Sequence, residues 1–282
     1  MNSGFVYNII ILMQIRLVKE RVILFENGAK IRAAVRSGEF TGHTSGYATG
    51  CVQANLVVLQ AEWAYDFLLF AQRNPKPCPI LEVGDKGSYL TNYIAEDADI
   101  RSDIPKYRIY ENGSLTSEVN DITRLWQDDF VYFLLGCSFS FEQALIQAGL
   151  EIRHIEENVN VPMFTTNIKC KSAGKFKETP MVVSMRPFAS GDAVKAVEIT
   201  RDYPAVHGSP VHIGDPAQIG ISDINKPDFG DRVTIKDGEL PVFWACGVTP
   251  QNAAVVAKPP LMITHSPGHM FVGDMKDHEF KI

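Results

Sequence analysis

Two segments rich in glycine and proline in the last third of the chain concentrate side chains that transfer protons or bind metals. Imidazoles titrate near neutral pH and therefore suit general acid and general base chemistry. A transition-metal site is an alternative, but histidine spacing in loops is not diagnostic of one, as it would be on a helix face. The side chains concerned are His207, His212 and Asp215 in the string HGSPVHIGDP, and His265 and His269 in the string THSPGHMF.

Cys246 is the cysteine best placed for chemistry. It follows the apolar run 241–245 and precedes Thr249 and Pro250, which are typical of the first residues of a helix. A helix N-terminus and its free backbone N–H groups lower the pKa of a thiol, so Cys246 is a candidate base or nucleophile. A buried, unreactive thiol is the alternative.

Ser138 and Arg186 are candidates for binding an anion. A helix is predicted to begin near Ser138 or Ser140 in the string GCSFSFEQAL, and helix N-termini bind carboxylates and phosphates. Arg186 follows the apolar run MVVSM and could clamp a carboxylate with two hydrogen bonds. Helix capping by the serines and a surface ion pair for the arginine are the alternatives. A serine hydrolase is disfavoured, because a serine replaces the second glycine of the G-x-S-x-G motif.

Strands and helices that alternate along the chain must position these residues. Apolar spacing and turn residues predict each element. The predicted helices cover residues 22–35, 61–72, 121–135, 141–150 and 251–258, with a further one beginning at Ser190; the predicted strands cover 80–83, 181–185, 241–245 and 261–264. The apolar run 5–13 is expected to be a first strand or a disordered extension.

The strands at 241–245 and 261–264, with a helix between them, predict a βαβ unit with parallel strands. In open parallel sheets, ligands bind beyond the carboxyl ends of the strands. Those ends carry Cys246 and His265. We therefore expect both side chains to lie at neighbouring strand ends and to face one cleft.

Composition excludes several classes of protein. The chain has 282 residues, of which 45% are hydrophobic and 21% are charged, so it can bury a large core. A net charge of -6 without a basic run disfavours nucleic-acid binding. The run 5–13 is about half the length that crosses a bilayer. Five widely spaced cysteines without a C-x-x-C pair indicate neither a disulfide framework nor a zinc ribbon.

The expected partner is therefore a small carboxylate or amino acid, and the expected location is the reducing cytoplasm. The chain contains no P-loop, G-x-G-x-x-G, H-E-x-x-H or EF-hand motif, so the sequence gives no indication of an ATP or NAD site. Neither nucleic acid nor a membrane is expected as a partner, and a homo-oligomer is left open.

Seven strings follow one another along the chain: QANLVVL (53–59), QRNPKPCPILEV (72–83), GCSFSFEQAL (136–145), VVSMRP (182–187), HGSPVHIGDP (207–216), PVFWACGVTPQ (241–251) and THSPGHMF (264–271). As a set they resemble the bacterial hydro-lyase family to which the D-glutamate cyclase domain belongs. The resemblance covers about residues 32–282. Ala71 departs from it, because a cysteine is expected at this position in the family.

The resemblance implies an α/β protein with a three-layer sheet domain and a smaller, inserted two-layer α+β domain. The main domain is expected over residues 1–136 and 204–282, and the inserted domain over 137–203. The implied activity is a carbon–oxygen lyase reaction on a small amino or carboxylic acid, first of all cyclisation of D-glutamate to 5-oxo-D-proline with loss of water. The alternatives are a non-catalytic module that binds a small amino acid or dicarboxylate, and a dehydratase of a hydroxy acid.

Such a cyclisation needs a general base, a general acid and donors to an oxyanion, and it demands no cofactor or metal. The residues themselves favour His207 and His265 for proton transfer, with Cys246 assisting. Should the histidines not act, Cys246, Asp215 or Glu142 is the next candidate. The residues expected to bind the substrate are Ser138, Arg186, His212, Asp215 and His269.

Overall fold

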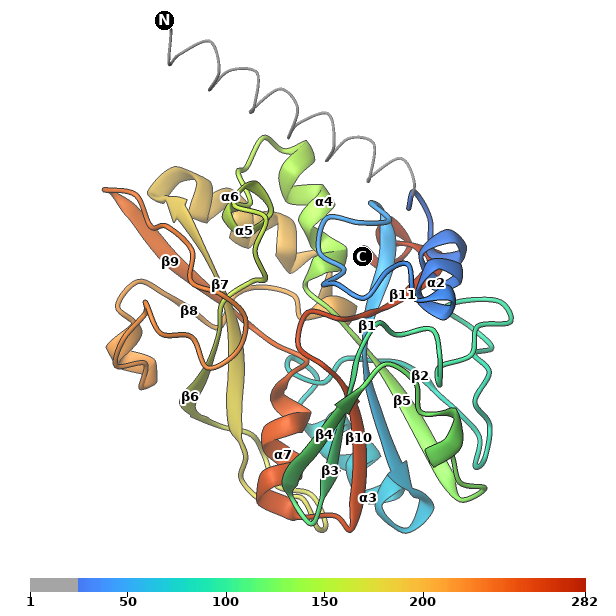
Figure 1. Ribbon diagram of the computed structural model, residues 1–282. Coiled ribbons are helices and arrows are strands. Elements are labelled where there is room, and N and C mark those ends of the chain that lie inside the picture. Colours follow the sequence, from blue (N-terminus) through green and yellow to red (C-terminus); the bar gives the residue numbers. More distant parts are fainter. Residues whose placement is uncertain (1–24) are drawn as a thin grey trace, which may run out of the picture.

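Strand β1 (Cys51–Gln60) lies at the centre of the larger of two sheets, and nearly all of its residues are buried. This burial explains its apolar sequence, because a central strand is covered on both faces. The structure is a computed structural model and describes residues 25–282 (Figure 1). The strand or extension expected at 5–13 lies outside the described residues.

The larger sheet has seven strands, all paired antiparallel. Their order is β2-β5-β1-β10-β3-β4. β11 pairs with the first half of β1, whereas β10 pairs with its second half. The remaining strands are β2 (Ile80–Val83), β3 (Tyr107–Glu111), β4 (Ser114–Val119), β5 (Phe130–Gly136), β10 (Leu261–His265) and β11 (Phe271–Lys276).

The smaller sheet has the strand order β6-β7-β9-β8, again with antiparallel pairs. Its strands are β6 (Met163–Lys169), β7 (Pro180–Ala189), β8 (His212–Ile213) and β9 (Glu239–Ala245). The sheet thus takes strands from both sides of residue 203. Its strands are not confined to the segment 137–203, and the domain boundaries stay a prediction.

Helices lie between the two sheets and on their outer faces (Figure 1). α3 (Ala61–Arg73) and α7 (Thr249–Ala257) contribute to one core with apolar residues of both sheets. α4 (Phe139–Gln147) and α6 (Ser190–Arg201) pack on the other face of the smaller sheet. The other helices are α2 (Gly28–Ser37), α5 (Arg153–Glu156) and the short 3-10 turns η1 (Thr123–Leu125), η2 (Pro204–Val206), η3 (Pro216–Ile219) and η4 (Asp277–Phe280).

The mixed α/β class expected from the sequence is confirmed, and so are the helix at 61–72 and the strand at 80–83. The helix predicted at 121–135 is wrong, because this segment contains η1 and β5. Along β5, alternate side chains enter two different cores: Phe130 and Tyr132 face one, whereas Phe133 and Leu135 face the other. Both faces being apolar, the strand shows no alternation in its sequence, and its spacing also fits a helix.

The predicted parallel βαβ unit is also wrong. β9 belongs to the smaller sheet, whereas β10 lies in the larger sheet between β1 and β3 and is antiparallel to both. The reason is the position of α7, whose buried face, with Ala253 and Ala254, lies in the core shared by the two sheets. The helix therefore carries the chain from one sheet to the other, and Cys246 and His265 do not end neighbouring strands.

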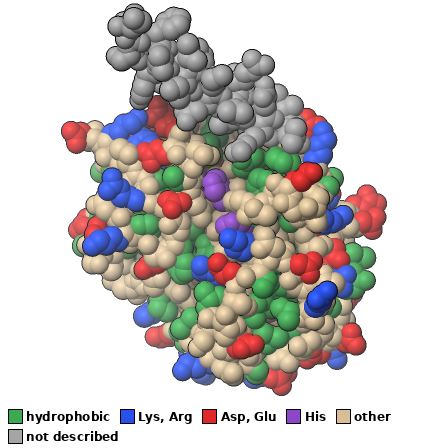
Figure 2. Space-filling model, viewed as in Figure 1, with side chains coloured by type: hydrophobic (Ala, Val, Ile, Leu, Met, Phe, Trp, Pro, Cys, Tyr) green, Lys and Arg blue, Asp and Glu red, His purple; other side chains and the backbone are tan. Residues whose placement is uncertain are grey.

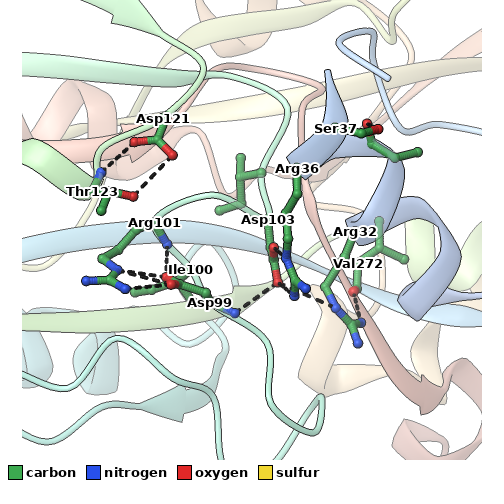
Figure 3. Close-up of polar contacts among 12 residues, drawn as sticks. Arg32, Arg36, Ser37, Asp99, Ile100, Arg101, Asp103, Asp121, Thr123 and Val272 are labelled. Atoms are coloured by element: carbon green, nitrogen blue, oxygen red, sulfur yellow. Dashed lines mark hydrogen bonds and ion pairs between the residues drawn. The ribbon is translucent and has the colours of Figure 1, made fainter. Parts of the chain in front are cut away.

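Two arginines of α2 bind the helix to the larger sheet and to the loop before β3 (Figure 3). Arg32 is buried and donates to the Val272 carbonyl oxygen of β11 at 2.8 Å. Arg36 forms a two-point pair with the buried carboxylate of Asp103, which also accepts from the backbone N–H of Asp99 at 2.9 Å. Residues 38–50 follow α2, and Ser45 of this segment contacts the site described next.

Candidate functional site

Two strand ends meet at the junction of the two sheets. β5 of the larger sheet ends at Gly136, and β9 of the smaller sheet ends at Ala245. Each is followed by a cysteine and then by a helix: α4 begins after Cys137 and α7 after Cys246. Both thiols belong to one buried cluster of side chains. The chain therefore brings two of its strand-to-helix turns together at the junction.

A buried ion pair between Arg186 of β7 and Glu142 of α4 lies at this junction. The Arg186 Nε donates to Glu142 Oε1 at 3.0 Å, and neither side chain is more than 4% exposed. Ser138 and Ser184 accept hydrogen bonds from the same guanidinium at 3.0 and 3.2 Å. With two further residues that contact Glu142, these side chains form what we call the Glu142 network: Ser45, Ser138, Glu142, His154, Ser184 and Arg186.

His154 is the second partner of Glu142. Its Nε2 lies 3.2 Å from Glu142 Oε1 and 3.0 Å from the Ser45 hydroxyl, and its ring stacks on Phe139. Burial raises the pKa of Glu142, but the charges of His154 and Arg186 and their hydrogen bonds outweigh burial and hold this pKa below its ordinary value. Glu142 is therefore an anion at neutral pH, held between an imidazole and a guanidinium.

The position of Arg186 follows from the length of β7. The strand was expected to end at residue 185, but it continues to Ala189 and pairs Arg186 with Val242 of β9. The guanidinium lies 5.4 Å from the ring centre of Phe141 and 5.5 Å from that of Trp244. Contact with aromatic faces favours a cation that has lost its water. Such a desolvated charge still needs a counter-charge, which Glu142 supplies.

Cys246 does not have the lowered thiol pKa that the sequence led us to expect. Burial raises the pKa of Cys246 to about 11, although the Val248 N–H and the charge of Arg186 act in the opposite direction. The same cause raises the pKa of Cys137. Both groups are neutral thiols near pH 7, because desolvation outweighs the helix N-termini beside them.

His207 and His265 are buried side chains tied to backbone groups. His207 Nδ1 lies 2.6 Å from the Lys76 carbonyl oxygen, and His265 Nδ1 accepts from the Leu56 N–H at 3.2 Å. Burial is the largest cause that lowers the pKa of His207 to about 4 and that of His265 to about 3. Both imidazoles are therefore neutral near pH 7 and not poised between their two forms. Their catalytic roles stay a prediction.

The other residues expected to bind substrate lie in different surroundings. Ser138 and Arg186 are brought together within the Glu142 network. His212 Nε2 lies 2.8 Å from the Asp215 carbonyl oxygen, and the Asp215 carboxylate accepts from the N–H of Ala217 to cap η3. Among the residues that the structure describes, no hydrogen bond joins this loop to the Glu142 network.

His269 lies on the turn between β10 and β11, where its Nδ1 is 3.1 Å from the Pro267 carbonyl oxygen. Burial lowers its pKa, and the charge of His43 acts in the same direction. The pKa of His43 is in turn lowered by burial and, to a smaller extent, by the charge of His154.

Sequence reasoning missed Ser45, His43 and His154. The first two lie in the string TGHTSGYATG, whose density of glycine and hydroxyl side chains around a histidine is a signal for a functional loop. His154 lies in a charged stretch, EIRHIEEN, which carries no recognisable motif. Only the fold, which packs α5 against β7, places it beside Glu142.

A small cavity borders the Glu142 network. The cavity, of about 30 Å³, has Glu142 in its wall, beside the loop at 46–51, but this volume holds only one or two water molecules. Figure 2 shows histidine side chains in a furrow near the centre of the molecule.

Within residues 25–282, no group of three or more histidine, cysteine, aspartate or glutamate side chains is arranged to hold a metal ion. In the same range, none of the helices combines the length and apolar character needed to cross a membrane. Fold and site together define a mixed α/β protein that has a buried, charged network at the junction of two antiparallel sheets.

Comparison with known proteins assigns the family. Residues 131–274 match the family described as D-glutamate cyclase. Proteins of Bacillus licheniformis and Clostridium beijerinckii, each named "Putative hydro-lyase", are 62% and 60% identical over 90% of this chain and 96% of their own length. One of Bacillus subtilis with the same description is 58% identical over 89% of this chain and 98% of its own length. The chain belongs to this hydro-lyase and D-glutamate cyclase family, which supports a lyase-type enzyme.

Among solved structures, a nitrogen repressor-like protein of Methanococcus jannaschii matches 87% of this chain and 98% of its own, with a TM-score of 0.34 and 9% identity. A likeness of this degree supports no conclusion about function.

Proposed function

We propose that this protein cyclises D-glutamate to 5-oxo-D-proline and releases water. The observation that carries the proposal is the Glu142 network, because all its members except Ser45 lie within the segment 131–274 that matches the D-glutamate cyclase family. Perturbed, buried charges of this kind concentrate at functional sites. The substrate class also fits the acidic chain, which has no basic surface run for nucleic acid.

The reaction joins two ends of one molecule. The amine nitrogen attacks the carbon of the side-chain carboxyl group, a C–N bond forms, and a C–O bond breaks. Two of the three ammonium protons end on the departing oxygen, which leaves as water. Holding the substrate in a bent conformer supplies much of the rate, because the attack is intramolecular.

The Glu142 network supplies a rigid, charged floor for this step. The guanidinium of Arg186 is fixed by Glu142, Ser138 and Ser184, so it needs no rearrangement when charge develops on the substrate oxygen. Ser138 directly precedes α4, whose dipole favours negative charge at this end. Ser138 and Arg186, expected from the sequence to meet a carboxylate, keep that role in the proposal.

The test is a substrate screen on the purified full-length protein. It is incubated with D-glutamate, L-glutamate and a set of hydroxy acids, and products that have lost water are identified by chiral chromatography and mass spectrometry. We expect 5-oxo-D-proline from D-glutamate. Binding of D-glutamate without turnover would instead support a binding module, and loss of water from a hydroxy acid would support a dehydratase.

Two variants connect the activity to the site. Ser138→Ala removes one hydroxyl that bonds Arg186 and should lower kcat/KM by about 10-fold or more, as for other hydrogen bonds to charged groups. Lys195→Ala is the control, because its side chain is 58% exposed on α6. Equal activity of the two variants would remove the Glu142 network from the reaction.

A further inference from the structure

Asn160 and His43 each keep a buried polar atom without a hydrogen-bond partner. Among the described side chains, Asn160 Oδ1 and His43 Nδ1 are two of five such atoms. Most buried polar groups in proteins are paired, so each exception calls for a cause. The other three atoms belong to Arg32, His207 and His265. Of the five atoms, those of Asn160 and His43 belong to loops that contact the turn at 267–269.

The two residues flank one turn. Asn160 Nδ2 donates to the carbonyl oxygen of Pro267 at 3.1 Å, and the N–H of Thr44, next to His43, donates to the carbonyl oxygen of Gly268 at 2.8 Å. Because these carbonyl groups are consecutive, Asn160 and the neighbour of His43 contact the same turn. The turn also carries His269, whose pKa is lowered first by burial and also by the charge of His43.

Asp231 gives a second link between the two residues. Its carboxylate accepts from the backbone N–H of Asn160 at 2.9 Å, and its own N–H donates to the Asn160 carbonyl oxygen at 3.1 Å. The negative charge of Asp231 also acts on His43. His43, Asn160 and Asp231 therefore form one neighbourhood with the turn at 267–269.

The orientation of the Asn160 amide is fixed by its contacts. Because Nδ2 donates to Pro267, Oδ1 is left as a hydrogen-bond acceptor. The amide packs so closely on Gly268 that a Cβ there would lie 2.4 Å from both Nδ2 and Oδ1. Gly268 also has a φ of 82°, which favours glycine. The free acceptor is thus held in place by the turn itself.

Thr44 fixes the backbone beside His43. Its buried hydroxyl donates to Gln53 Oε1 at 2.7 Å and accepts from the N–H of Met270 at 3.1 Å. The residue next to His43 is therefore hydrogen-bonded both to β1 and to the end of the turn. Two residues on, Ser45 contacts His154 at 3.0 Å, so the same loop also reaches the Glu142 network.

An acceptor and an unpaired imidazole nitrogen on two loops that contact one turn suit a ligand group that only donates hydrogen bonds. A primary ammonium group has three N–H donors and no acceptor. We propose that Asn160 Oδ1 and His43 Nδ1 bind the amino group of the substrate, with His43 as the general base that deprotonates it. This inference rests on the proposed cyclisation for the catalytic part, whereas amine recognition stands on the two unpaired atoms.

The proton balance follows from these positions. His43 Nδ1 accepts one ammonium proton, and the freed nitrogen attacks the side-chain carboxyl carbon. His43 then gives that proton to a carboxyl oxygen. The second proton follows the same route as the C–O bond breaks, and water leaves. Burial lowers the pKa of His43, and His154 lowers it further while Asp231 raises it, so the imidazole begins the cycle neutral and able to accept.

The binding test compares D-glutamate with glutarate, which lacks the amine, by calorimetry on the wild type and on Asn160→Ala. We expect Asn160→Ala to weaken D-glutamate binding by about 10-fold, the effect of one good hydrogen bond to a charged group, and to leave glutarate binding unchanged. Thermal unfolding checks that the variant is folded. Equal effects on both ligands, or none on either, would overturn amine recognition.

The kinetic test uses His43→Gln, which keeps a polar side chain but cannot carry the proton. We expect kcat to fall by about 10²–10⁴, with a smaller change in KM, and the acidic limb of the wild-type pH profile to vanish. His154 and Asp231 are the titratable groups whose charges act on His43. His278→Gln is the control, because its side chain is 73% exposed, and it should retain that limb. A retained limb in His43→Gln would assign the base elsewhere. If no variant or wild type cyclises D-glutamate, but Asn160→Ala still separates the two ligands, the proposed function fails and the amine site stands.

Discussion

Arg186 and Glu142 form an ion pair that is almost entirely shielded from water. Arg186 lies on β7 of the smaller sheet, whereas Glu142 lies on α4, the helix that follows β5 of the larger sheet. Bringing a single charge to such a place costs several kcal/mol, whereas the pair with its added hydrogen bonds offsets that cost. The contact therefore couples the packing of the two sheets to the charge state of the site.

The first prediction concerns this coupling. Glu142→Gln leaves the guanidinium of Arg186 buried without a counter-charge and should lower the free energy of unfolding by about 3–5 kcal/mol. Urea denaturation measures the change. The matched control is Glu151→Gln, because Glu151 pairs with Lys236 at 3.0 Å on the surface and such pairs contribute about 1 kcal/mol or less. Similar losses in the two variants would contradict a special role for the buried pair.

The second prediction concerns pH. The pKa values of His207 and His265 are lowered to about 4 and about 3, so the folded protein resists protonation of both rings. The unfolded chain takes up these protons below about pH 6.5, and stability should fall as the pH drops from there towards 4, by about 1.4 kcal/mol per pH unit for each histidine. Denaturation at several pH values measures the slope.

Nuclear magnetic resonance separates these two histidines from the rest. Their ring signals should stay constant between pH 8 and about pH 5 in the folded protein and titrate in denaturant near pH 6.5. Titration of either buried ring near pH 6.5 in the folded state would refute the prediction.

Glu142 affects stability in a lower pH range, because its pKa is depressed in the folded protein. Its contribution to the free energy of unfolding is present above about pH 4.5 and is lost below it.

Much of the element order could be predicted from the sequence, because local signals such as the apolar spacing of α3 agree with the tertiary structure. β5 could not, since Phe130 and Phe133 enter different cores and both faces of the strand are apolar. The sheet topology could not be predicted from the sequence either. Whether α7 returns the chain to the same sheet or passes it to another depends on contacts that no local pattern records.

The site shows the same division. Ser138 and Arg186 could be found because a helix start and an arginine after an apolar run are local signals. Glu142 was a secondary candidate, and its pairing with His154 and Arg186 became visible only in three dimensions. The thiol of Cys246 shows why the chemistry could not be predicted: its sequence neighbours lower the pKa, but burial, a property of the fold, raises it.

The third prediction concerns Cys246. With a pKa of about 11, the group is a neutral thiol. Cys246→Ser should therefore lower the free energy of unfolding but leave most of kcat. Folded protein should also react slowly with iodoacetamide at pH 8, because the thiol is buried and protonated. Steady-state kinetics and a thermal unfolding curve test both statements. Loss of nearly all activity in a folded Cys246→Ser protein would restore the thiol as a catalytic group.

The last prediction concerns the close approach of the two strand-to-helix turns at Gly247. A Cβ at Gly247 would lie 2.0 Å from Nδ2 of Asn55, which donates to the carbonyl oxygen of Gly136 at 2.8 Å. Gly247→Ala must therefore push Asn55 away from Gly136 and should cost about 1–3 kcal/mol of stability, as overpacking does elsewhere. Because Gly136 ends the strand that leads to Ser138, activity should fall as well. Gly191→Ala on α6 is the control, since nothing lies within 4 Å of its Cβ position. Unchanged stability and activity in Gly247→Ala would mean that the junction tolerates separation of the two turns.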